Sequence, residues 1–244
     1  MDRLHHRPHP VEYGQREHFR PDLVEVYLHS TPWTCTVYGP RCTVHRMEVL
    51  GVVNKKGGAG KTTVTIGLAA ALRRLGLRVG VIDTDPNGSA TNWLRSVDEL
   101  DTVPCEAADL AGLIAACADD YDMLIIDSPP NDAAAISSVA AVSDLVIIPV
   151  APTGLEVDQL PDTVELISAT GARWVVVPVR VRLSTSTGRQ IRELISGAEI
   201  PVTRNMIQLR EAIAQAFGEL PPALSFAPLA IELRELLSEA EVPA

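Results

Sequence analysis

The sequence predicts an α/β fold with a mostly parallel central sheet that is flanked by helices on both faces. Short apolar runs rich in Val and Ile recur from Met47 onward, as expected of strands that are buried on both faces. Longer segments with helical character separate these runs, and strands that alternate with helices form parallel sheets with right-handed crossovers. The 244 residues and 46% hydrophobic content suit one domain with its own core.

The predicted elements follow one another in a regular order. Strands are expected at residues 49–53, 79–82, 123–126, 145–150 and 174–179. Helices are expected at residues 61–76, 106–118, 131–142, 154–169, 185–196, 207–217 and 227–240. Because ligands of such sheets bind at the carboxyl ends of strands, the chemistry should follow Val53, Ile82, Ile126 and Val150.

Residues 1–46 differ from the rest of the chain, because they hold all six His residues and show no sustained period of 2 or 3.6. We expect residues 1–46 to be either a poorly ordered extension or a stretch upstream of a native start at Met47, and we expect one domain at 47–244. The spacing of Cys35, Cys42 and His45 lacks the second pair of a zinc site, so no metal is expected there. The chain shows neither a secretory signal nor a membrane-length apolar run, which predicts a cytoplasmic protein.

The strongest motif lies at residues 55–63, where the sequence reads Lys-Lys-Gly-Gly-Ala-Gly-Lys-Thr-Thr. Consecutive glycines let backbone N–H groups turn inward around phosphate oxygens, and the N-terminus of the following helix favours an anion. Lys61 would reach the β- and γ-phosphates, and the Thr62 hydroxyl would bind Mg²⁺. The predicted nucleotide-phosphate site comprises Lys56, Gly57, Gly58, Ala59, Gly60, Lys61, Thr62 and Thr63.

Acidic residues follow two later predicted strands. Asp83 and Asp85 follow the second strand, and acids at i and i+2 at a strand end point to the same side. Asp127 follows the third strand. Beside a phosphate loop, such carboxylates can hold Mg²⁺ and orient a water molecule. The string from Asp85 to Gly88 is also a plain turn signal, which would be preferred if the segment stood alone.

The second lysine of the loop points to a family. Lys56 precedes the glycines, and the form Lys-Gly-Gly-x-Gly-Lys-Thr-Thr resembles the deviant Walker A box of the ParA/MinD superfamily. The resemblance covers about residues 47–240 and implies a P-loop NTPase that hydrolyses ATP with Mg²⁺. It also implies that Lys56 reaches the partner's bound phosphates in an ATP-dependent homodimer.

The same resemblance assigns roles to the acids. Residues 83–90 are similar to the Asp-x-Asp-Pro-Gln-Gly-Ser box of the ParA branch, with Asn87 in place of Gln. It implies that Asp85 positions the attacking water, that Asp83 supports the metal site, and that Asp127 holds Mg²⁺ through a water, as in Walker B. The residues implied in catalysis are Lys56, Lys61 and Asp85; those implied at the metal are Thr62, Asp83 and Asp127.

One departure from the family concerns recognition of the base. The family often has an Asn-Arg pair after the fifth strand that helps to hold adenine. This sequence reads Pro178-Val179-Arg180 at the corresponding place. The residues that recognise adenine are therefore not assigned, and the preference for ATP over GTP rests on the resemblance.

The charge distribution bears on the partner. The net charge is −10, but residues 168–210 hold seven Arg and two Glu, which gives this segment a charge of +5. By resemblance, the ATP-bound dimer would bind DNA non-specifically on the nucleoid and drive plasmid or chromosome partitioning. A ParB-like centromere-binding protein would stimulate hydrolysis. Ordinary surface arginines beside acidic neighbours are the alternative. The candidate DNA-binding residues are Arg189, Arg192, Arg204 and Arg210.

Other uses of such an ATPase remain open. A MinD-like membrane-cycling ATPase needs a terminal basic amphipathic helix, whereas residues 232–241 are acidic, so no membrane partner is expected. An iron–sulfur reductase of the nitrogenase iron-protein type needs placed thiolates, and no Cys follows Asp127. ParA-like ATPases also position other cargo, and the sequence does not identify the cargo here.

Overall fold

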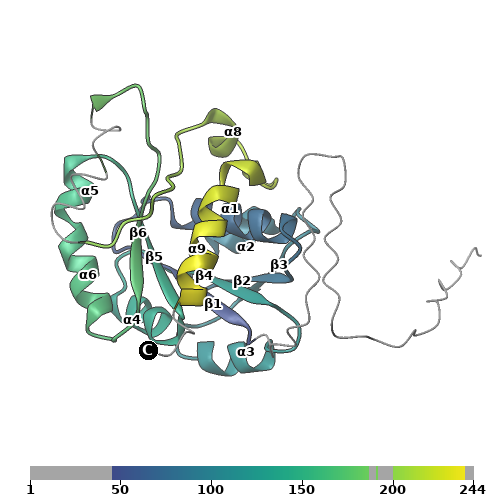
Figure 1. The fold of residues 1–244 in the computed structure, drawn as a ribbon. Coiled ribbons are helices and arrows are strands. Elements are labelled where there is room, and N and C mark those ends of the chain that lie inside the picture. The colour runs from purple at the N-terminus through teal and green to yellow at the C-terminus, as the bar shows by residue number, and fades with distance from the viewer. Residues whose placement is uncertain (1–45, 187–190, 192–199, 240–244) are drawn as a thin grey trace, which may run out of the picture. The chain divides into compact units, whose positions relative to one another are not determined.

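The computed structural model describes residues 46–186, 191 and 200–239 (Figure 1). Within them, six strands form one sheet in the order β3-β2-β4-β1-β5-β6, and every neighbouring pair is parallel. The strands are β1 (Glu48–Val52), β2 (Val79–Asp83), β3 (Asp101–Pro104), β4 (Met123–Asp127), β5 (Leu145–Val150) and β6 (Trp174–Pro178). The expected parallel α/β architecture is confirmed.

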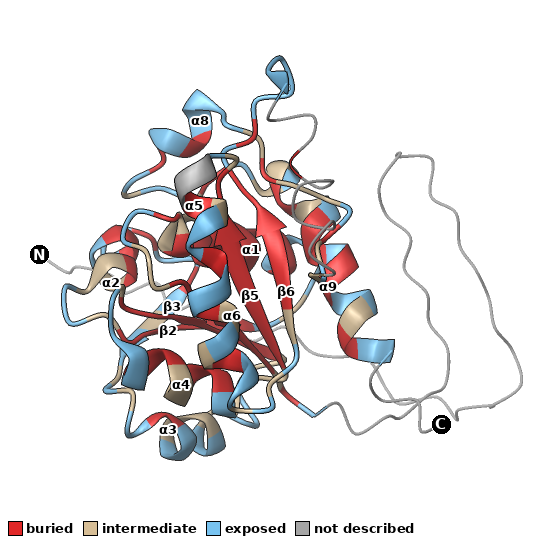
Figure 2. Cartoon of the chain, turned by 90° about the vertical axis from the view of Figure 1, so that its left-hand side faces the viewer, coloured by how far each residue is buried: buried red, intermediate tan, exposed pale blue. Residues whose placement is uncertain are grey.

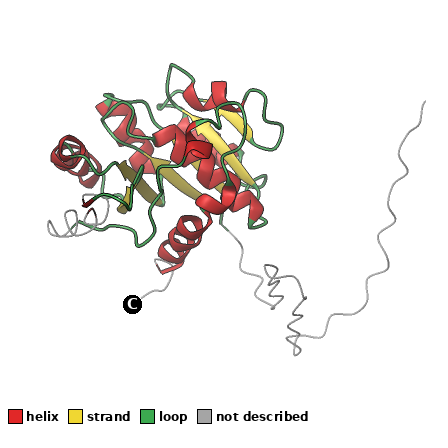
Figure 3. Ribbon diagram, turned by 90° about the horizontal axis from the view of Figure 1, so that it is seen from above, coloured by secondary structure: helices red, strands yellow, loops and turns green. Residues whose placement is uncertain are grey.

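Helices cover both faces of this sheet (Figures 1 and 3). The helices are α1 (Lys61–Arg74), α2 (Ser89–Leu94), α3 (Leu110–Ala116), α4 (Ala133–Val142), α5 (Gly154–Asp158), α6 (Leu160–Ser168), α8 (Glu211–Ala214), the 3₁₀ turn η1 (Ala223–Ser225) and α9 (Ala227–Glu239). Helices α1, α2 and α9 share one apolar core with the sheet, and α3, α4 and α6 share the other.

The central strands are buried on both faces, which explains their continuous apolar runs (Figure 2). In β1 and just after it the side chains alternate between the two cores: Leu50 and Val52 belong to the α1 side, whereas Val49 and Val53 belong to the α4 side. Gly51 lies between Leu50 and Val52 in the chain. A Cβ atom at this position would overlap the Ser143 hydroxyl, so a larger residue would not fit there.

The structure differs from the expected elements in four places. Strand β3 and helix α2 were not predicted; β3 is an edge strand with mostly exposed side chains, so it carries no apolar run. The helix expected at 154–169 is two helices, α5 and α6, and Pro161 lies at the start of the second. The helix expected at 207–217 is only the short α8. Residues 1–45 and most of 185–196 lie outside the described residues.

The register of the sheet places three chemical segments side by side. Asp127 at the end of β4 is opposite Val52 at the end of β1 and opposite Asp83 at the end of β2. The loop that follows β1 therefore begins next to both acidic residues. This edge of the sheet is the carboxyl edge, where ligands of parallel sheets bind.

Candidate functional site

The loop between β1 and α1 is shaped by glycine. Gly58 and Gly60 have φ angles of 72° and 92°, in the left-handed region that side chains with a Cβ atom rarely adopt. Gly60 is the N-cap of α1, so the first N–H groups of that helix open onto the loop. A loop of this form at the N-terminus of a 14-residue helix suits a phosphate group.

Asn54 anchors the beginning of the loop, although the sequence suggested no role for it. Its amide nitrogen donates to the carbonyl oxygen of Pro149 in β5 at 2.8 Å, and its amide oxygen accepts from the Lys56 N–H at 2.9 Å. The sequence feature that could have indicated this role is a polar side chain directly after a buried strand. Asn54 thereby fixes the backbone from which the Lys56 side chain extends.

Lys61 lies inside the loop and is only 6% exposed. Its Nζ donates to the carbonyl oxygens of Asn54 at 3.2 Å and Lys56 at 3.3 Å. Burial lowers the pKa of Lys61, and the Asp127 and Asp85 carboxylates oppose that shift. The ammonium group is thus bound only to loop carbonyl groups in the contacts described, and an incoming phosphate is a stronger acceptor for it.

Thr62 and Asp127 form the most closely spaced polar pair of the site. The Thr62 hydroxyl donates to Asp127 Oδ2 at 2.6 Å, and the Thr65 hydroxyl approaches Oδ1 at 3.4 Å. Asp127 is 1% exposed. Its pKa is raised to about 7: burial is the largest cause and the nearby Asp83 adds to it, whereas the Thr62 hydrogen bond opposes the rise. A hydroxyl and a buried carboxylate paired in this way supply the hard oxygen ligands that Mg²⁺ prefers.

Asp83 and Asp85 have different surroundings. The buried Asp83 carboxylate accepts from the Asp85 N–H at 3.1 Å and from the N–H and hydroxyl of Thr91 at 2.8 and 2.9 Å. Asp83 therefore organises the following loop, and its part at the metal stays a prediction. Asp85 accepts from the backbone and side-chain N–H groups of Asn87 at 2.9 Å. Unlike Asp83, Asp85 lines the cavity over the loop.

Two of the cavities that adjoin the loop share lining residues. One of about 510 Å³ lies over it and is lined by Lys61, Thr62 and Asp85 among others. The second, of about 290 Å³, is mostly apolar and is lined by Gly60, Thr63, Val64, Trp93, Val179, Arg180, Ile207, Gln208, Leu209, Arg210, Ile213, Ala214 and Phe217. Gly60, Thr63 and Arg180 border both cavities, so a single ligand can extend from the polar cavity into the apolar one. The sequence did not indicate the apolar cavity, because its walls come from distant segments.

Lys56 and Arg180 meet at a third residue, Glu156, to which the sequence gave no role. Lys56 Nζ lies 3.5 Å from Glu156 Oε1, and the Arg180 guanidinium donates to the same oxygen at 2.9 Å. Arg180 has a φ angle of 53°, unusual for a residue other than glycine. The backbone therefore bends at the place where the family often has its Asn-Arg pair.

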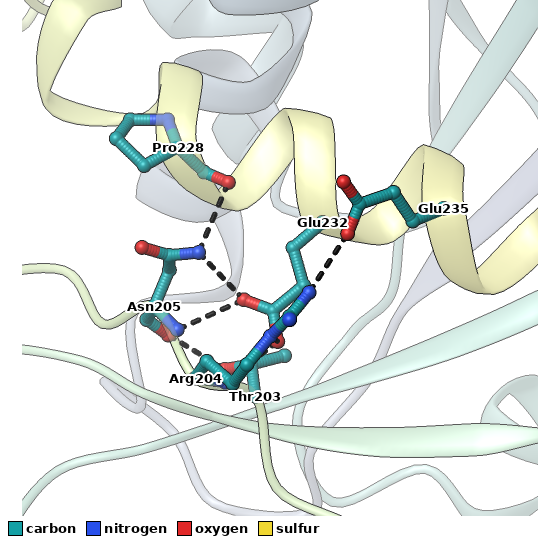
Figure 4. Close-up of polar contacts among 6 residues, drawn as sticks. All are labelled: Thr203, Arg204, Asn205, Pro228, Glu232 and Glu235. Atoms are coloured by element: carbon teal, nitrogen blue, oxygen red, sulfur yellow. Dashed lines mark hydrogen bonds and ion pairs between the residues drawn. The ribbon is translucent and has the colours of Figure 1, made fainter.

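The four arginines considered for DNA binding are not all described. Arg189 and Arg192 lie outside the described residues. Arg210 is exposed before α8, at the rim of the apolar cavity. Arg204 is exposed, but its guanidinium donates to Glu235 at 2.7 Å and its N–H to Glu232 at 2.6 Å (Figure 4). A DNA phosphate would have to compete with these carboxylates, so Arg210 is better placed than Arg204 for such a contact.

The sequence model of the family described as "CobQ/CobB/MinD/ParA nucleotide binding domain" matches residues 50–222. The chain belongs to this family. The match includes the phosphate loop, all three acidic residues and Arg180, and the expected kinship with ParA/MinD ATPases is confirmed. The nucleotide-binding domain of this family thus comprises most of the described structure.

Relatives of this CobQ/CobB/MinD/ParA-family chain have diverse names. It is 30% identical over 126 residues to "Maintenance of carboxysome distribution protein A" of Halothiobacillus neapolitanus, with 49% of this chain and 58% of that protein covered. It is 29% identical over 185 residues to "Protein virC1" of Rhizobium rhizogenes, with 69% and 79% covered. It is 30% identical over 169 residues to "Sporulation initiation inhibitor protein Soj" of Bacillus subtilis, with 49% and 66% covered.

Solved structures share the fold of this family member. Cobyrinic acid a,c-diamide synthase of Mycobacterium smegmatis, solved with an ATP analogue and magnesium, has a TM-score of 0.65 at 18% identity, with 80% of this chain and 97% of that chain covered. The cell division ATPase MinD of Pyrococcus furiosus has a TM-score of 0.63 at 18% identity, with 78% and 99% covered. One structure of similar fold thus contains an ATP analogue with magnesium.

Proposed function

We propose that the protein is an Mg²⁺-dependent ATPase that forms a homodimer with ATP, binds DNA non-specifically and partitions a plasmid or chromosome. The observation that carries this proposal is the different placement of two of the three lysines in the phosphate loop, Lys56 and Lys61. Lys61 is 6% exposed, whereas the Lys56 side chain is 26% exposed and lies 3.5 Å from Glu156. One lysine can therefore serve the bound nucleotide while the other remains available to a second copy.

The residues present fit Mg²⁺ and a nucleoside triphosphate. The closely spaced Thr62 and Asp127 oxygens would hold Mg²⁺, which supplies charge neutralisation at the phosphates. Lys61 would exchange its loop carbonyl partners for phosphate oxygens. Asp85, on the wall of the polar cavity, would orient the attacking water molecule. The base would enter the apolar cavity beside Arg180.

A test of the nucleotide site compares Lys61→Ala with wild type. Loss of the buried ammonium group should weaken MgATP binding at least tenfold and abolish hydrolysis, because its charge-assisted bonds to phosphate are removed. Isothermal titration calorimetry and phosphate release would measure the two effects. Lys55→Ala is the matched control, because Lys55 pairs with Asp162 outside the polar cavity. Equal ATP binding by Lys61→Ala and wild type would contradict this assignment.

Lys56→Ala tests the shared use of the loop. We expect it to bind ATP in the monomer nearly as wild type does, but to lose ATP-dependent dimerisation. Sedimentation velocity with a slowly hydrolysed ATP analogue would separate monomer from dimer. A wild-type protein that stays monomeric with ATP would refute the dimer, even if it hydrolyses ATP.

The positive segment at 168–210 supports DNA as the surface on which the dimer acts. Backbone phosphates are bound by Arg without base readout, and their binding weakens as salt rises. The stimulating partner would be a ParB-like protein bound to the cargo DNA. The family relatives also include carboxysome distribution proteins, so another cargo is the second candidate.

Arg210→Glu tests the DNA contact. It should weaken ATP-dependent binding to any duplex DNA and reduce the salt dependence of that binding. Arg189→Glu and Arg192→Glu extend the test to the other candidates. Arg74→Glu, at the exposed end of α1, makes the same charge change away from the positive segment. Fluorescence anisotropy would compare DNA binding by these variants. If Arg74→Glu weakens DNA binding as much as Arg210→Glu, the cause is the net charge and not a binding surface.

A MinD-like attachment to a membrane is less well supported. Helix α9 buries four apolar side chains in the core that it shares with α1 and Phe226, namely Leu229, Ala230, Leu233 and Leu237, whereas Ile231 is exposed. That face is then not available to a lipid surface. Among the described residues, no helix combines the length and the apolar character that crossing a membrane requires.

A further inference from the structure

One oxygen of the Asp85 carboxylate is held by a single neighbour, Asn87. The backbone N–H and the side-chain amide of Asn87 both donate to Asp85 Oδ1, each at 2.9 Å. Among the residues that the structure describes, none donates a hydrogen bond to Asp85 Oδ2. Both side chains line the polar cavity over the phosphate loop, together with Lys61 and Thr62. Oδ2 is therefore the oxygen that remains free to accept a hydrogen bond from a water molecule in that cavity.

The main chain around Asp85 is fixed as well. Its N–H donates to Asp83 Oδ1 at 3.1 Å, and its carbonyl oxygen accepts from the Gly88 N–H at 2.7 Å. Only rotation about the side-chain bonds of Asp85 could then redirect its carboxylate. Such a rotation would break both hydrogen bonds from Asn87, so Asn87 determines which oxygen of Asp85 is available.

Asn suits this task better than the Gln of the box that residues 83–90 resemble. The short Asn side chain places its amide beside its own backbone N–H, so that both groups reach one carboxylate oxygen. Gln has one more rotatable bond, and ordering it costs more side-chain entropy. The departure from the similar box at position 87 therefore favours a tightly held Asp85.

We propose that Asn87 is a positioning residue for ATP hydrolysis, which holds Asp85 Oδ1 so that Oδ2 receives the attacking water molecule. This inference rests on the proposed function, because Asp85 has that task only in an ATPase. In the reaction the water oxygen bonds to the γ-phosphorus, the bond from that phosphorus to the β–γ bridging oxygen breaks, and ADP, phosphate and a proton are formed. A fixed acceptor aligns the water for this attack. Because the Asn87 amide is engaged with Asp85, Asn87 acts on the rate of hydrolysis and not on MgATP binding.

Asn87→Ala tests the positioning role. It removes the side-chain donor and keeps the backbone N–H, so the Asp85 carboxylate is held by one hydrogen bond instead of two. We expect the rate constant of ATP hydrolysis to fall about three- to tenfold, as for the loss of one partly exposed hydrogen bond to a charged group. The dissociation constant for MgATP should stay within about twofold of wild type, because the contact serves the chemical step. Single-turnover phosphate release and isothermal titration calorimetry measure the two quantities.

Asn92→Ala is the matched control, because it makes the same change in the same segment. The Asn92 side-chain amide donates to the Asn87 carbonyl oxygen at 3.1 Å, and it makes no described contact with Asp85. We expect hydrolysis by this variant to stay within about twofold of wild type. Asn87 and Asn92 are both exposed, so neither variant should impair folding.

Hydrogen exchange of the Asn87 side chain gives a readout without nucleotide. In the nucleotide-free protein, NMR should find the Asn87 side-chain amide protons exchanging with water more slowly in wild type than in Asp85→Ala, where their acceptor is absent. Equal exchange in the two proteins would overturn the inference, whether or not the protein hydrolyses ATP.

The hydrolysis experiment separates this inference from the proposed function. A wild-type protein that hydrolyses no ATP would refute the proposed function, and with it the positioning role of Asn87, whereas slow exchange would still support the Asn87–Asp85 contact. If wild type hydrolyses ATP, the inference alone is overturned when Asn87→Ala is no slower than Asn92→Ala. It is also overturned when MgATP binding by Asn87→Ala weakens as much as its rate of hydrolysis falls.

Discussion

At the scale of single residues, the Thr62–Asp127 pair combines two opposing demands. Asp127 is buried at the end of a central strand, and burial favours its protonated form. A magnesium ligand must instead be ionised. With a pKa of about 7, this carboxyl group is only partly ionised near neutral pH, and a bound cation would favour its ionised form.

The ionisation of Asp127 makes the stability of the nucleotide-free protein depend on pH. Its pKa is raised from 3.8 to about 7, so between about pH 4 and 7 the unfolded chain has lost a proton that the folded chain retains. The contribution of Asp127 to the free energy of unfolding should then fall as pH rises through that window. Urea unfolding of wild type and Asp127→Asn would measure it. A stability difference between the two that is constant from pH 4 to 7 would contradict the prediction.

Some residues of the site were predictable and others were not. Lys61, Thr62 and Asp127 lie at motif positions beside strand ends, and a parallel sheet brings strand ends together. Glu156 and Arg180 come from different segments, and their contact depends on a left-handed residue and a short helix that no periodicity indicates. Arg204 was weighed by its charge alone, and the sequence did not show that Glu235 on α9 would pair with it.

At the scale of elements, α1 joins the phosphate loop to the C-terminal part of the chain. It packs against α9 and η1, and Gly67 in its middle lies directly on the fully buried Phe226 ring. A Cβ atom at position 67 would overlap that ring. The absence of a side chain therefore sets how closely α1 approaches the segment that begins α9.

Gly67→Ala should destabilise the protein by about 1–3 kcal/mol, because overpacking outweighs the better helix propensity of Ala. Gly112→Ala in the exposed part of α3 is the control, since a Cβ atom there meets nothing within 4 Å. That variant should be neutral or up to about 1 kcal/mol more stable. Denaturant unfolding would compare them, and equal effects would exclude the close packing at Phe226.

A second tie to α9 is made by Glu232. This buried carboxylate accepts from the Arg204 N–H at 2.6 Å and from the Asn205 N–H and side-chain amide at 2.8 Å (Figure 4). Asn205 also donates to the Pro228 carbonyl oxygen at 3.2 Å. The loop after β6 is thus held to the first two turns of α9 by one acid.

Glu232→Gln should lower the free energy of unfolding by about 1–3 kcal/mol, because one of the buried donors then faces an NH₂ group. Glu235→Gln, on the same helix but 56% exposed, should change it by about 0.5 kcal/mol or less. ATP hydrolysis by both folded variants should match wild type. Equal destabilisation by the two would show that the exposed Arg204–Glu235 pair matters as much as the buried one.

At the scale of the whole molecule, the sequence predicted the central strands well, because strands buried on both faces are unbroken apolar runs. It missed β3, whose side chains are mostly exposed at the sheet edge, and α2, which has only six residues. Helix α8 was predicted too long, since the apolar residues near it line a cavity and do not continue a helix.

Nucleotide binding should stabilise the whole domain. MgATP at about 100 times its dissociation constant contributes about 2.7 kcal/mol if it binds only the folded state. For a chain of this size, that would raise the melting temperature by about 5–10 °C. Scanning calorimetry with ATPγS would measure the shift, which Lys61→Ala should largely remove. An equal shift for that variant would place the nucleotide elsewhere.

The position of β4 between β1 and β2 has an evolutionary consequence. The strand that carries Asp127 is also a central strand of the sheet, so a substitution that disrupts it would impair folding and the proposed metal site together. The phosphate loop cannot be transplanted into another protein with its function intact, because its acidic counterpart comes from a strand encoded some distance away. Natural selection for a stable core therefore also preserves the strand that would bring Asp127 to the proposed nucleotide site.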